Sequence, residues 1–293
     1  MTVEKWINLS LGQRGLKMYK PLVMSNEEYH GKTKYESSST VRKALVNPKK
    51  YLHDKTAETV PTKAMEEGTA VHTYFLENNL FKNRYCFKPK AFNGRTKEGK
   101  QWMEEHGHLN VLASEWEENL IHMNHSFLSS PAKMIYDLDG LTELSYFSED
   151  LGGIRAKCRP DWISSDSGIV VDLKTTQDAS PKGFQKSIAN FGYHIQAAFY
   201  LRTLQSLGLD SYDFIFIAIE KTAPFCVGVY RASTEMLEEG NKKVDEAINK
   251  ILWCKENDSY PDYTPNEIET ISLPPWMTKK SEEQPSQEEI ELY

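Results

Sequence analysis

Hydrophobic residues along the chain repeat with the period of strands in some segments and with the period of helices in others. Residues 213–220, Asp-Phe-Ile-Phe-Ile-Ala-Ile-Glu, are almost continuously apolar, which is typical of a strand buried on both faces of a sheet. A further strand is predicted over 225–230, and the alternating pattern of 142–148 predicts another.

Helices are expected where apolar residues recur three or four positions apart after a capping residue. Hydroxyl residues at 37–40 precede the run 41–46, and Asn47-Pro48 should end that helix. Residues 88–110 are polar, so a long loop or lid is expected there. The predicted helices cover 41–46, 68–77, 114–128, 184–207 and 233–255. This order indicates one α/β domain with a mixed sheet that is covered by helices on both faces.

Between these segments the chain is predicted to form a β-hairpin with arms at 154–163 and 169–175. The turn at 164–168 is rich in Ser, Asp and Gly, which tolerate tight backbone angles. A turn centred on its middle places Asp161 opposite Asp172. A slip of one full pleat keeps both aspartates on the same face, whereas a slip of one residue separates them.

One face of this hairpin would carry two carboxylates and one ammonium group. Because side chains alternate along a strand, Asp172 and Lys174 share a face with Asp161. Val171 and Leu173 would point the other way, into a core. Like charges directly opposite destabilise a sheet, and a divalent cation would compensate for them better than the lysine alone. An exposed hairpin face can also carry these residues by chance, and that alternative stays open at this point.

Other polar residues could join this cluster. Glu143 lies on the strand predicted before the hairpin and could meet both aspartates at one edge; such oxygen-rich clusters suit Mg²⁺ or Mn²⁺. His72 is a reasonable further ligand for Mn²⁺, although a lone histidine on a helix is more often structural. Gln196 and Tyr200 share a helix face and could contact a phosphate or a base, or they could belong to an interior helix.

The bulk composition is that of an ordinary globular protein. The chain has 293 residues, of which 39% are hydrophobic, so it can bury a substantial core. No run approaches the ~18–20 apolar residues that span a bilayer, and the N-terminus has no apolar stretch typical of a signal peptide. We therefore expect a cytoplasmic protein with an N-terminal arm at 1–24, one domain at 25–278 and an acidic, disordered tail at 279–293.

Charge and cysteine content narrow the function classes. The net charge of −7 argues against a nucleic-acid partner, but residues 281–293 contain five glutamates and no basic residue, which leaves −2 on the first 280 residues. Basic residues gather at 42–50 and 82–100 and could contact phosphates, although solvated surface is the simpler explanation for any one cluster. The four cysteines are far apart, which disfavours a zinc ribbon or a disulfide framework and leaves an iron–sulphur cluster as a remote alternative.

Five spaced motifs make the chain resemble nucleases of the PD-(D/E)XK superfamily, within its RecB-like branch. The motifs occur in the family's order over residues 68–200, and they imply a restriction-endonuclease-like core with a mixed central β-sheet flanked by helices. They are Gly68-Thr-Ala-Val-His72, Glu143, Arg159-Pro-Asp161, Asp172-Leu-Lys174-Thr-Thr and Gln196-x-x-x-Tyr200.

A longer match, over roughly residues 20 to 278, is similar to the nuclease domain of the RecE-type exodeoxyribonuclease VIII family. It adds further matching segments at both ends of the domain, around the Arg-Pro-Asp motif and within the helix of the last motif. They are Ser25-Asn-Glu-Glu-Tyr-His30, Ser38-Ser-Thr-Val, Cys158-Arg-Pro-Asp, Tyr193-His-Ile-Gln-Ala-Ala-Phe-Tyr200 and Leu273-Pro-Pro-Trp276.

The resemblance implies a centre with two Mg²⁺ ions, for which Mn²⁺ could substitute. The implied metal ligands are His72, Asp161, Asp172 and the backbone carbonyl of Leu173.

The resemblance also implies roles around that centre. Lys174 would act in activating the nucleophilic water, and Glu143 would support the metal or the water. Gln196 and Tyr200 would help to hold the DNA.

Members of the RecE-type family degrade one strand of linear duplex DNA from its 5′ end and leave 3′ overhangs for recombination and repair. They form rings around DNA and work beside a single-strand annealing protein of the RecT type, and they are often phage-encoded. The implied partners are therefore linear duplex ends, further copies of this chain in a ring, and such an annealing protein. Two alternatives stay open: a structure- or sequence-specific endonuclease on the same fold, and a catalytically inactive module that binds DNA ends.

Overall fold

The computed structural model describes residues 20–57, 62–164, 168–209, 213–264, 266 and 268–274. The chain divides into two compact units, Met1–Tyr260 and Pro261–Tyr293, and the described helices and strands belong to the first. The tail predicted at 279–293 and most of the predicted N-terminal arm lie outside the described residues. Among the described helices, none combines the length and the apolar character needed to cross a bilayer.

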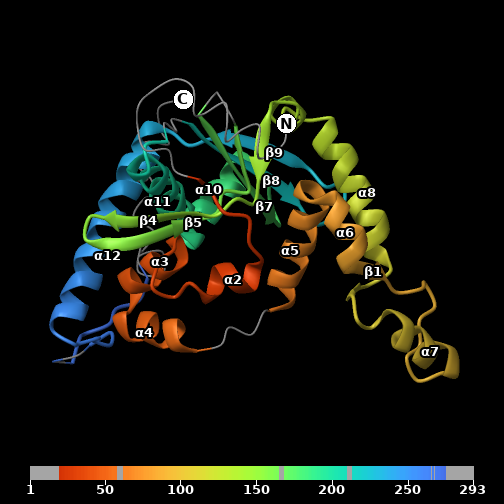
Figure 1. Cartoon of the computed structure of the whole chain (residues 1–293), viewed down its shortest axis with the longest axis horizontal. Helices are drawn as coiled ribbons and strands as arrows, with labels where there is room; N and C mark the ends of the chain where they lie inside the picture. The colour runs from red at the N-terminus through yellow and green to blue at the C-terminus, as the bar shows by residue number, and fades with distance from the viewer. Residues whose placement is uncertain are drawn as a thin grey trace, which may run out of the picture. The chain divides into compact units, whose positions relative to one another are not determined.

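Five strands form the central mixed sheet (Figure 1), in which β7 and β8 run parallel and the other neighbours are antiparallel. The order is β3 (Gly140–Thr142), β6 (Trp162–Ser164), β7 (Ile169–Thr176), β8 (Asp213–Glu220) and β9 (Val227–Arg231). β8 lies between two partners and most of its side chains are buried, which accounts for its continuous apolar sequence. The predicted fold class is confirmed.

The register of β6 and β7 agrees with the predicted hairpin. Trp162 pairs with Val171 and Ile163 pairs with Val170. Asp161 directly precedes β6, and Asp172 directly follows Val171 in β7. The same register therefore places Asp161 opposite Asp172, as predicted.

The first hairpin arm is not one continuous strand, contrary to the prediction. β5 (Ile154–Cys158) pairs with β4 (Tyr146–Leu151) in a separate two-stranded sheet, and the chain changes sheet at Arg159-Pro160. Proline has no N–H group to continue a ladder. Arg159 is buried and its Nε donates to Ser145 Oγ at 2.9 Å, which fixes the break. The aspartate that follows Pro160 is thereby placed at the start of β6.

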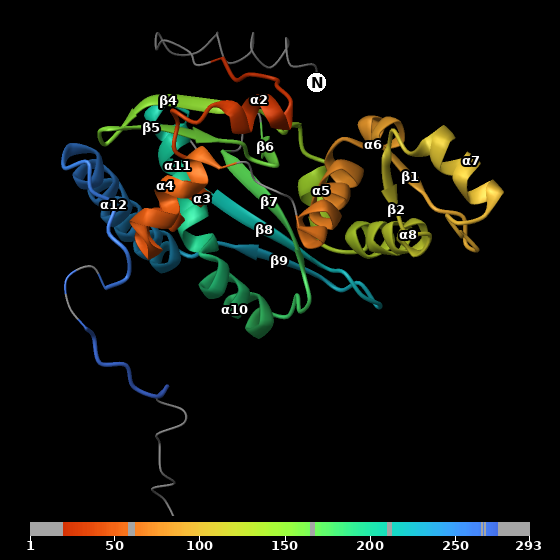
Figure 2. The ribbon, with the colours of Figure 1, turned by 90° about the horizontal axis from the view of Figure 1, so that it is seen from below.

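Helices cover both faces of the sheet, as Figure 1 and Figure 2 show. On one face lie α10 (Pro181–Phe191), α11 (Tyr193–Ser206) and the start of α12 (Thr234–Glu256). On the other face lie α5 (Lys63–Leu76) and α8 (Glu115–Leu128). Each fully buried Phe or Leu side chain contributes about 1.5–3 kcal/mol to folding. The first core includes Phe184, Phe214 and Phe216, and the second includes Val171, Leu173 and Ile217.

A third core joins α3 (Ser38–Val46) and α4 (Pro48–Thr56) to the β4–β5 pair and to α11 and α12. The predicted caps hold: Thr40 N donates to Ser37 Oγ, and Ser37 N donates to Thr40 Oγ1 at 2.7 Å. Asn47 ends α3 as predicted, and its side chain then caps α4. The arrangement fixes α3 beside α11.

The helix predicted over 184–207 is two helices, α10 and α11. Gly192 separates them and has φ of +64°, a left-handed conformation that ends the first helix at little steric cost. Helical periodicity continues on both sides of this residue, so the pattern of apolar residues did not reveal the break.

The prediction of a long loop or lid at 88–110 is wrong in part. The segment contains α7 (Lys97–His106), which begins with the Thr96 side chain accepting a bond from Gly99 N at 3.1 Å. The short strands β1 (Tyr85–Phe87) and β2 (Asn110–Leu112) pair in parallel on either side of it. These elements follow α6 (Asn78–Arg84) and lie away from the central sheet (Figure 2). The remaining described helices are α2 (Asn26–Gly31) and α9 (Ala132–Tyr136).

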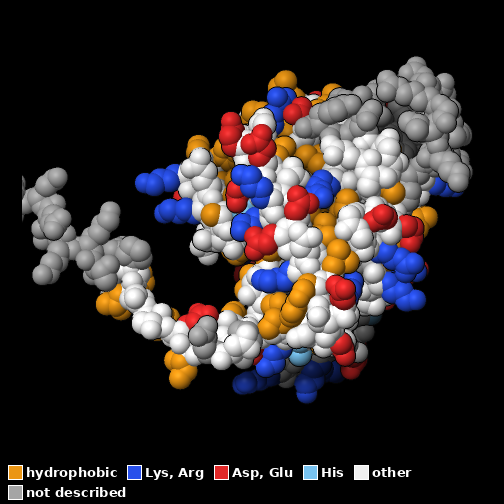
Figure 3. Space-filling model, turned by 90° about the vertical axis from the view of Figure 1, so that its left-hand side faces the viewer, with side chains coloured by type: hydrophobic (Ala, Val, Ile, Leu, Met, Phe, Trp, Pro, Cys, Tyr) orange, Lys and Arg blue, Asp and Glu red, His pale blue; other side chains and the backbone are white. Residues whose placement is uncertain are grey.

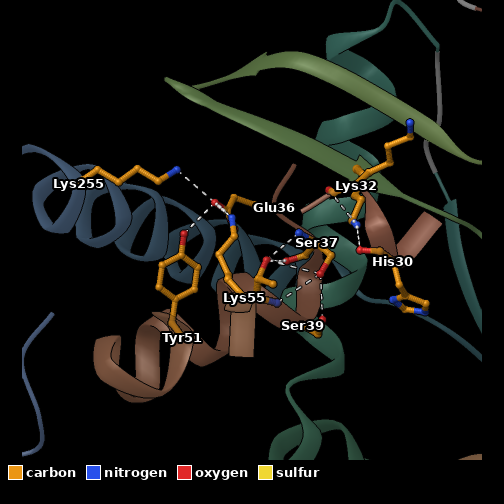
Figure 4. Close-up of polar contacts among 10 residues, drawn as sticks. His30, Lys32, Glu36, Ser37, Ser39, Tyr51, Lys55 and Lys255 are labelled. Carbon is orange, nitrogen blue, oxygen red and sulfur yellow. Dashed lines mark hydrogen bonds and ion pairs between the residues drawn. The ribbon is translucent and has the colours of Figure 1, made fainter. Parts of the chain in front are cut away.

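A buried ionic group, which we call the Glu36 cluster, joins α4 to α12 (Figure 4). Glu36 has no exposed surface, and its Oε1 accepts from Tyr51 at 2.8 Å, from Lys55 at 2.7 Å and from Lys255 at 3.2 Å. On the side of the molecule that carries α12, Figure 3 shows basic and acidic side chains interspersed. The charges on that side are therefore mixed in sign.

Candidate functional site

The predicted aspartate–lysine pair lies on the face of β7 that is turned toward α11. Lys174 Nζ lies 2.5 Å from Asp172 Oδ2, and Gln196 Nε2 of α11 donates to Asp172 Oδ1 at 2.7 Å. Val171 and Leu173 pack into the core on the opposite face, as predicted. Asp172 is almost completely buried, so Lys174 and Gln196 contact its two carboxylate oxygens away from bulk water. Each oxygen of this carboxylate therefore has its own partner, an ammonium group for Oδ2 and an amide for Oδ1.

Asp161 lies next to β7 and contacts two of the other predicted residues. Its Oδ2 accepts a hydrogen bond from Leu173 N at 2.6 Å and lies 3.5 Å from His72 Nδ1. His72 comes from the middle of α5, so the helix motif and the strand motif meet at this carboxylate. The prediction that the Leu173 carbonyl binds metal stays a prediction.

Glu143 does not lie within a strand, contrary to the prediction of one strand over 142–148. β3 ends at the preceding residue, and Glu143 has φ of +53°, a left-handed conformation that is uncommon for glutamate. Its N–H donates to the carbonyl of Asp161 at 3.2 Å. The turn ends β3 and brings the Glu143 side chain to the group around His72.

These contacts assemble a group that could hold a metal ion. His72, Glu143 and Asp161 each offer one ligand atom, and the three atoms lie within 4.8 Å of one another. An imidazole nitrogen with two carboxylate oxygens is a reasonable donor set for a divalent cation. The sequence assigned Glu143 a supporting role, whereas the geometry places it among the candidate ligands. Asp172 lies outside this group of three and is bound instead by Gln196 and Lys174.

Each of the three candidate ligands affects the ionisation of its neighbours. Burial followed by the charge of Asp161 raises the pKa of Glu143 to about 8. Burial alone would lower the pKa of His72, but the adjacent Asp161 outweighs it and raises this pKa to about 9. Burial opposes ionisation of Asp161, yet the charge of His72 outweighs it, so the pKa of Asp161 is lowered. The site therefore binds protons at neutral pH that a metal cation would displace.

The pKa values of Asp172 and Lys174 also reflect a balance between burial and neighbouring charges. Burial raises the pKa of Asp172 to about 6 in spite of the neighbouring ammonium group. Burial would lower the pKa of Lys174, but Asp172 and then Asp161 outweigh it and raise this pKa. Lys174 is consequently an ammonium group at neutral pH and can donate hydrogen bonds.

The two residues predicted to hold DNA differ in their surroundings. Gln196 is buried and engaged with Asp172, and Tyr200 is half-buried with its ring against Phe214. Their DNA contacts stay predictions. The sequence reasoning missed Tyr193, whose ring centroid lies 4.8 Å from Lys174 Nζ. Its position three residues before Gln196, on the same helix face, was the available signal.

Comparison with known proteins supports the same fold. The family described as "PDDEXK-like domain of unknown function (DUF3799)" matches residues 37–273, most of the chain. No curated protein matches the chain.

Two solved structures are similar to the chain at low sequence identity. A "putative exonuclease" from Eubacterium rectale is 17% identical with a TM-score of 0.58, and the match covers 86% of this chain and 97% of that one. A phage-related exonuclease from Haemophilus somnus 129PT is 15% identical and covers 77% of this chain and 96% of that one, but its TM-score of 0.31 supports no argument. The first likeness shows the fold alone.

Proposed function

Because the chain belongs to this PDDEXK-like family, we propose that it is a metal-dependent nuclease that hydrolyses phosphodiester bonds of DNA. The observation that carries the proposal is the meeting of His72, Glu143 and Asp161, with their ligand atoms within 4.8 Å, beside the Asp172–Lys174 pair. A surface cluster of acids would not combine burial, raised pKa values and a neighbouring ammonium group in this way.

The residues present fit a divalent cation. His72, Glu143 and Asp161 would hold it, and Asp172, which Lys174 and Gln196 contact, would lie beside them as a further proposed ligand. Carboxylate oxygens favour Mg²⁺ or Mn²⁺, and these ions are the proposed cofactors. When bound, such a cation would lower the pKa of a water molecule and stabilise charge on the phosphoryl group.

The side chains around the centre have separable tasks. Lys174 is an ammonium group at neutral pH, so it would orient the attacking water or bind a phosphate oxygen as a donor and would not remove the proton. Gln196 holds the Asp172 carboxylate through Oδ1, and Lys174 contacts its Oδ2. The hydrogen bond from Leu173 N holds the Asp161 carboxylate beside His72.

The finer part of the proposal is a 5′-to-3′ exonuclease that acts on linear duplex ends and leaves 3′ overhangs for recombination by strand annealing. It is supported by the resemblance of segments between residues 25 and 276 to the RecE-type family. We also propose that copies of the chain form a ring and that a RecT-type annealing protein is the partner. Light scattering on the purified chain would give the number of subunits, and a single subunit with full processivity would contradict the ring.

Digestion of end-labelled linear duplex DNA tests the activity. We expect digestion with Mg²⁺ or Mn²⁺ and none in EDTA, with the label at the 5′ end released first. Asp161→Asn should remove the activity, and digestion at the wild-type rate by this variant would contradict the assigned site. Covalently closed circles should survive; their cleavage would identify an endonuclease instead. Binding of ends without any product would identify an inactive end-binding module.

A further inference from the structure

Arg42 reaches toward the active site from α3, a helix that carries none of the residues discussed above. Its stem packs against Gly192, since a methyl group at Gly192 would lie 2.8 Å from Arg42 Cδ. Gly192 directly precedes Tyr193, whose ring lies 4.8 Å from Lys174 Nζ. The guanidinium is therefore held beside the first turn of α11, the helix that also supplies Gln196.

Among the described residues, no hydrogen bond or ion pair of the Arg42 guanidinium accounts for this placement. Its Nε is buried without a hydrogen bond, and among the described residues no carboxylate forms an ion pair with it. Two other arginines that are at least half-buried are fully engaged: Arg159 donates to Ser145, and Arg202 lies 2.6 Å from Asp245. Burying a donor without an acceptor costs free energy, so this half-buried guanidinium is well suited to bind an added anion.

The surroundings of Arg42 also indicate an anion. Burial lowers the pKa of the guanidinium, and Tyr193, Tyr200 and then Asp172 oppose this shift, which places Arg42 within electrostatic range of the active-site carboxylate. Asp172 itself is already bound by Gln196 and Lys174, so it does not supply the missing partner.

We propose that Arg42 binds a non-bridging oxygen of the DNA phosphate at the cleaved bond or directly next to it. The inference rests on the proposed nuclease function and adds a substrate-binding residue to it. A guanidinium presents its donors in a planar fork that matches two phosphate oxygens, which an ammonium group does not. Arg42 and Lys174 together would place two cations at the phosphate, opposite in sign to the carboxylates of the metal centre.

A chemical double-mutant cycle tests the contact directly. Duplexes carry one neutral methylphosphonate at the first cleaved phosphate or at either neighbour, and single-turnover cleavage is measured for the wild type and Arg42→Met. On natural DNA we expect this variant to be slower by about 10- to 100-fold, the range of a charged hydrogen-bond pair. At one of the three positions the methylphosphonate should slow the wild type by a similar factor and leave the variant almost unchanged.

Two results would overturn the inference. One is cleavage of natural DNA by Arg42→Met at the wild-type rate. The other is an equal effect of the methylphosphonate on both proteins at every position, because independent sites give additive effects. Arg202→Met is the matched control, since Arg202 lies on α11 but has a carboxylate partner, and it should respond to each methylphosphonate as the wild type does.

Stability separates this role from a structural one. Methionine retains a stem that can pack on Gly192 and removes an unpaired charge, so Arg42→Met should melt at or above the wild-type temperature; a lower melting temperature or a failure to fold would show that Arg42 is structural. Arg42→Lys keeps the charge without the planar fork of donors and should show an intermediate loss of cleavage rate.

If the wild type cleaves no DNA, the nuclease proposal fails. The same double-mutant cycle is then measured as the affinity for duplex DNA in EDTA. Non-additive affinities would support the Arg42 contact there, and additive ones would overturn it.

Discussion

Two buried groups of charged residues in this molecule have opposite compositions. In the Glu36 cluster a single carboxylate oxygen accepts bonds from two ammonium groups and a tyrosine hydroxyl. In the candidate active site, three carboxylates share one ammonium group and one imidazole. Both groups are buried, but only in the second do carboxylates outnumber the basic side chains.

The difference shows that burial of a charge does not by itself identify a functional site. The Glu36 cluster joins α4 to α12 and already contains the cations that its carboxylate needs, so it is a structural contact. The side chains of the active-site group are short of positive charge, and proton uptake by Glu143 and His72 compensates for it at neutral pH. An added cation would complete the second group and would be repelled by the first.

The largest expected effect comes from removing a charge in the active site. Asp172→Asn should slow digestion of linear duplex by a factor on the order of 10³ or more, because the carboxylate beside the metal centre is lost. Stability should change little, because removing a buried carboxylate offsets the loss of one of the two carboxylates that stabilise the Lys174 ammonium group. The pKa of Asp172 is raised to about 6, so its ionised form weakens folding above that pH and a neutral residue does not. Calorimetry beside the digestion assay measures both; a large fall in melting temperature would contradict the charge imbalance.

The matching change in the Glu36 cluster should show the opposite pattern. Glu36→Gln removes the one carboxylate from two ammonium groups, and the Lys55 side chain is only 17% exposed, so its charge is left poorly solvated. We expect a loss of about 2 kcal/mol of unfolding free energy, below the range for fully buried pairs because both lysines reach water. Digestion per folded molecule should not change. Urea unfolding measures the loss, and reduced activity with normal stability would show that the cluster belongs to the active site.

How far the sequence predicts this site depends on whether the signal is local. Alternation in β7 correctly placed Asp172 and Lys174 on one face, and the turn composition gave the register that sets Asp161 opposite Asp172. Both depend on residues near one another in the chain, for which strand period and turn geometry suffice. The near-continuous apolar run of β8 identified a central strand for the same reason.

What the sequence did not predict depends on long-range packing or on single backbone angles. The left-handed conformation of Glu143 breaks the expected strand and turns its carboxylate into the ligand group, although glutamate rarely adopts it. Gly192 divides a segment whose helical periodicity continues on both sides. Arg42 lies 150 residues before Gly192, and nothing in the local pattern indicates that α3 packs beside α11. Only the tertiary fold brings it to the site.

A pH series on metal binding sharpens the contrast in charge. Glu143, with a pKa of about 8, and His72, with a pKa of about 9, hold protons at pH 7, and a bound cation must displace them. The affinity for Mn²⁺ should therefore rise with pH between about 6.5 and 8, by roughly tenfold per pH unit for each proton released. Titration calorimetry in buffers of different ionisation enthalpy counts these protons. An affinity that stays constant over this range would contradict the proposed ligands, and His72→Gln should release one proton fewer.

The smallest expected effect comes from the outer lysine of the Glu36 cluster. Lys255 is 45% exposed and lies 3.2 Å from Glu36, so its ion pair is partly solvated and should contribute at most about 1 kcal/mol. Lys255→Met should lower the urea midpoint slightly, and the difference should shrink in 0.5 M salt, where exposed charges are screened. Lys242→Met removes a fully surface pair with Glu239 on the same helix and should change almost nothing. A loss for Lys255→Met as large as that for Glu36→Gln would mean that both cations are needed to bury the carboxylate. The Glu36 cluster would then have no cation to spare. The ratio of carboxylates to cationic side chains would no longer distinguish it from the active site.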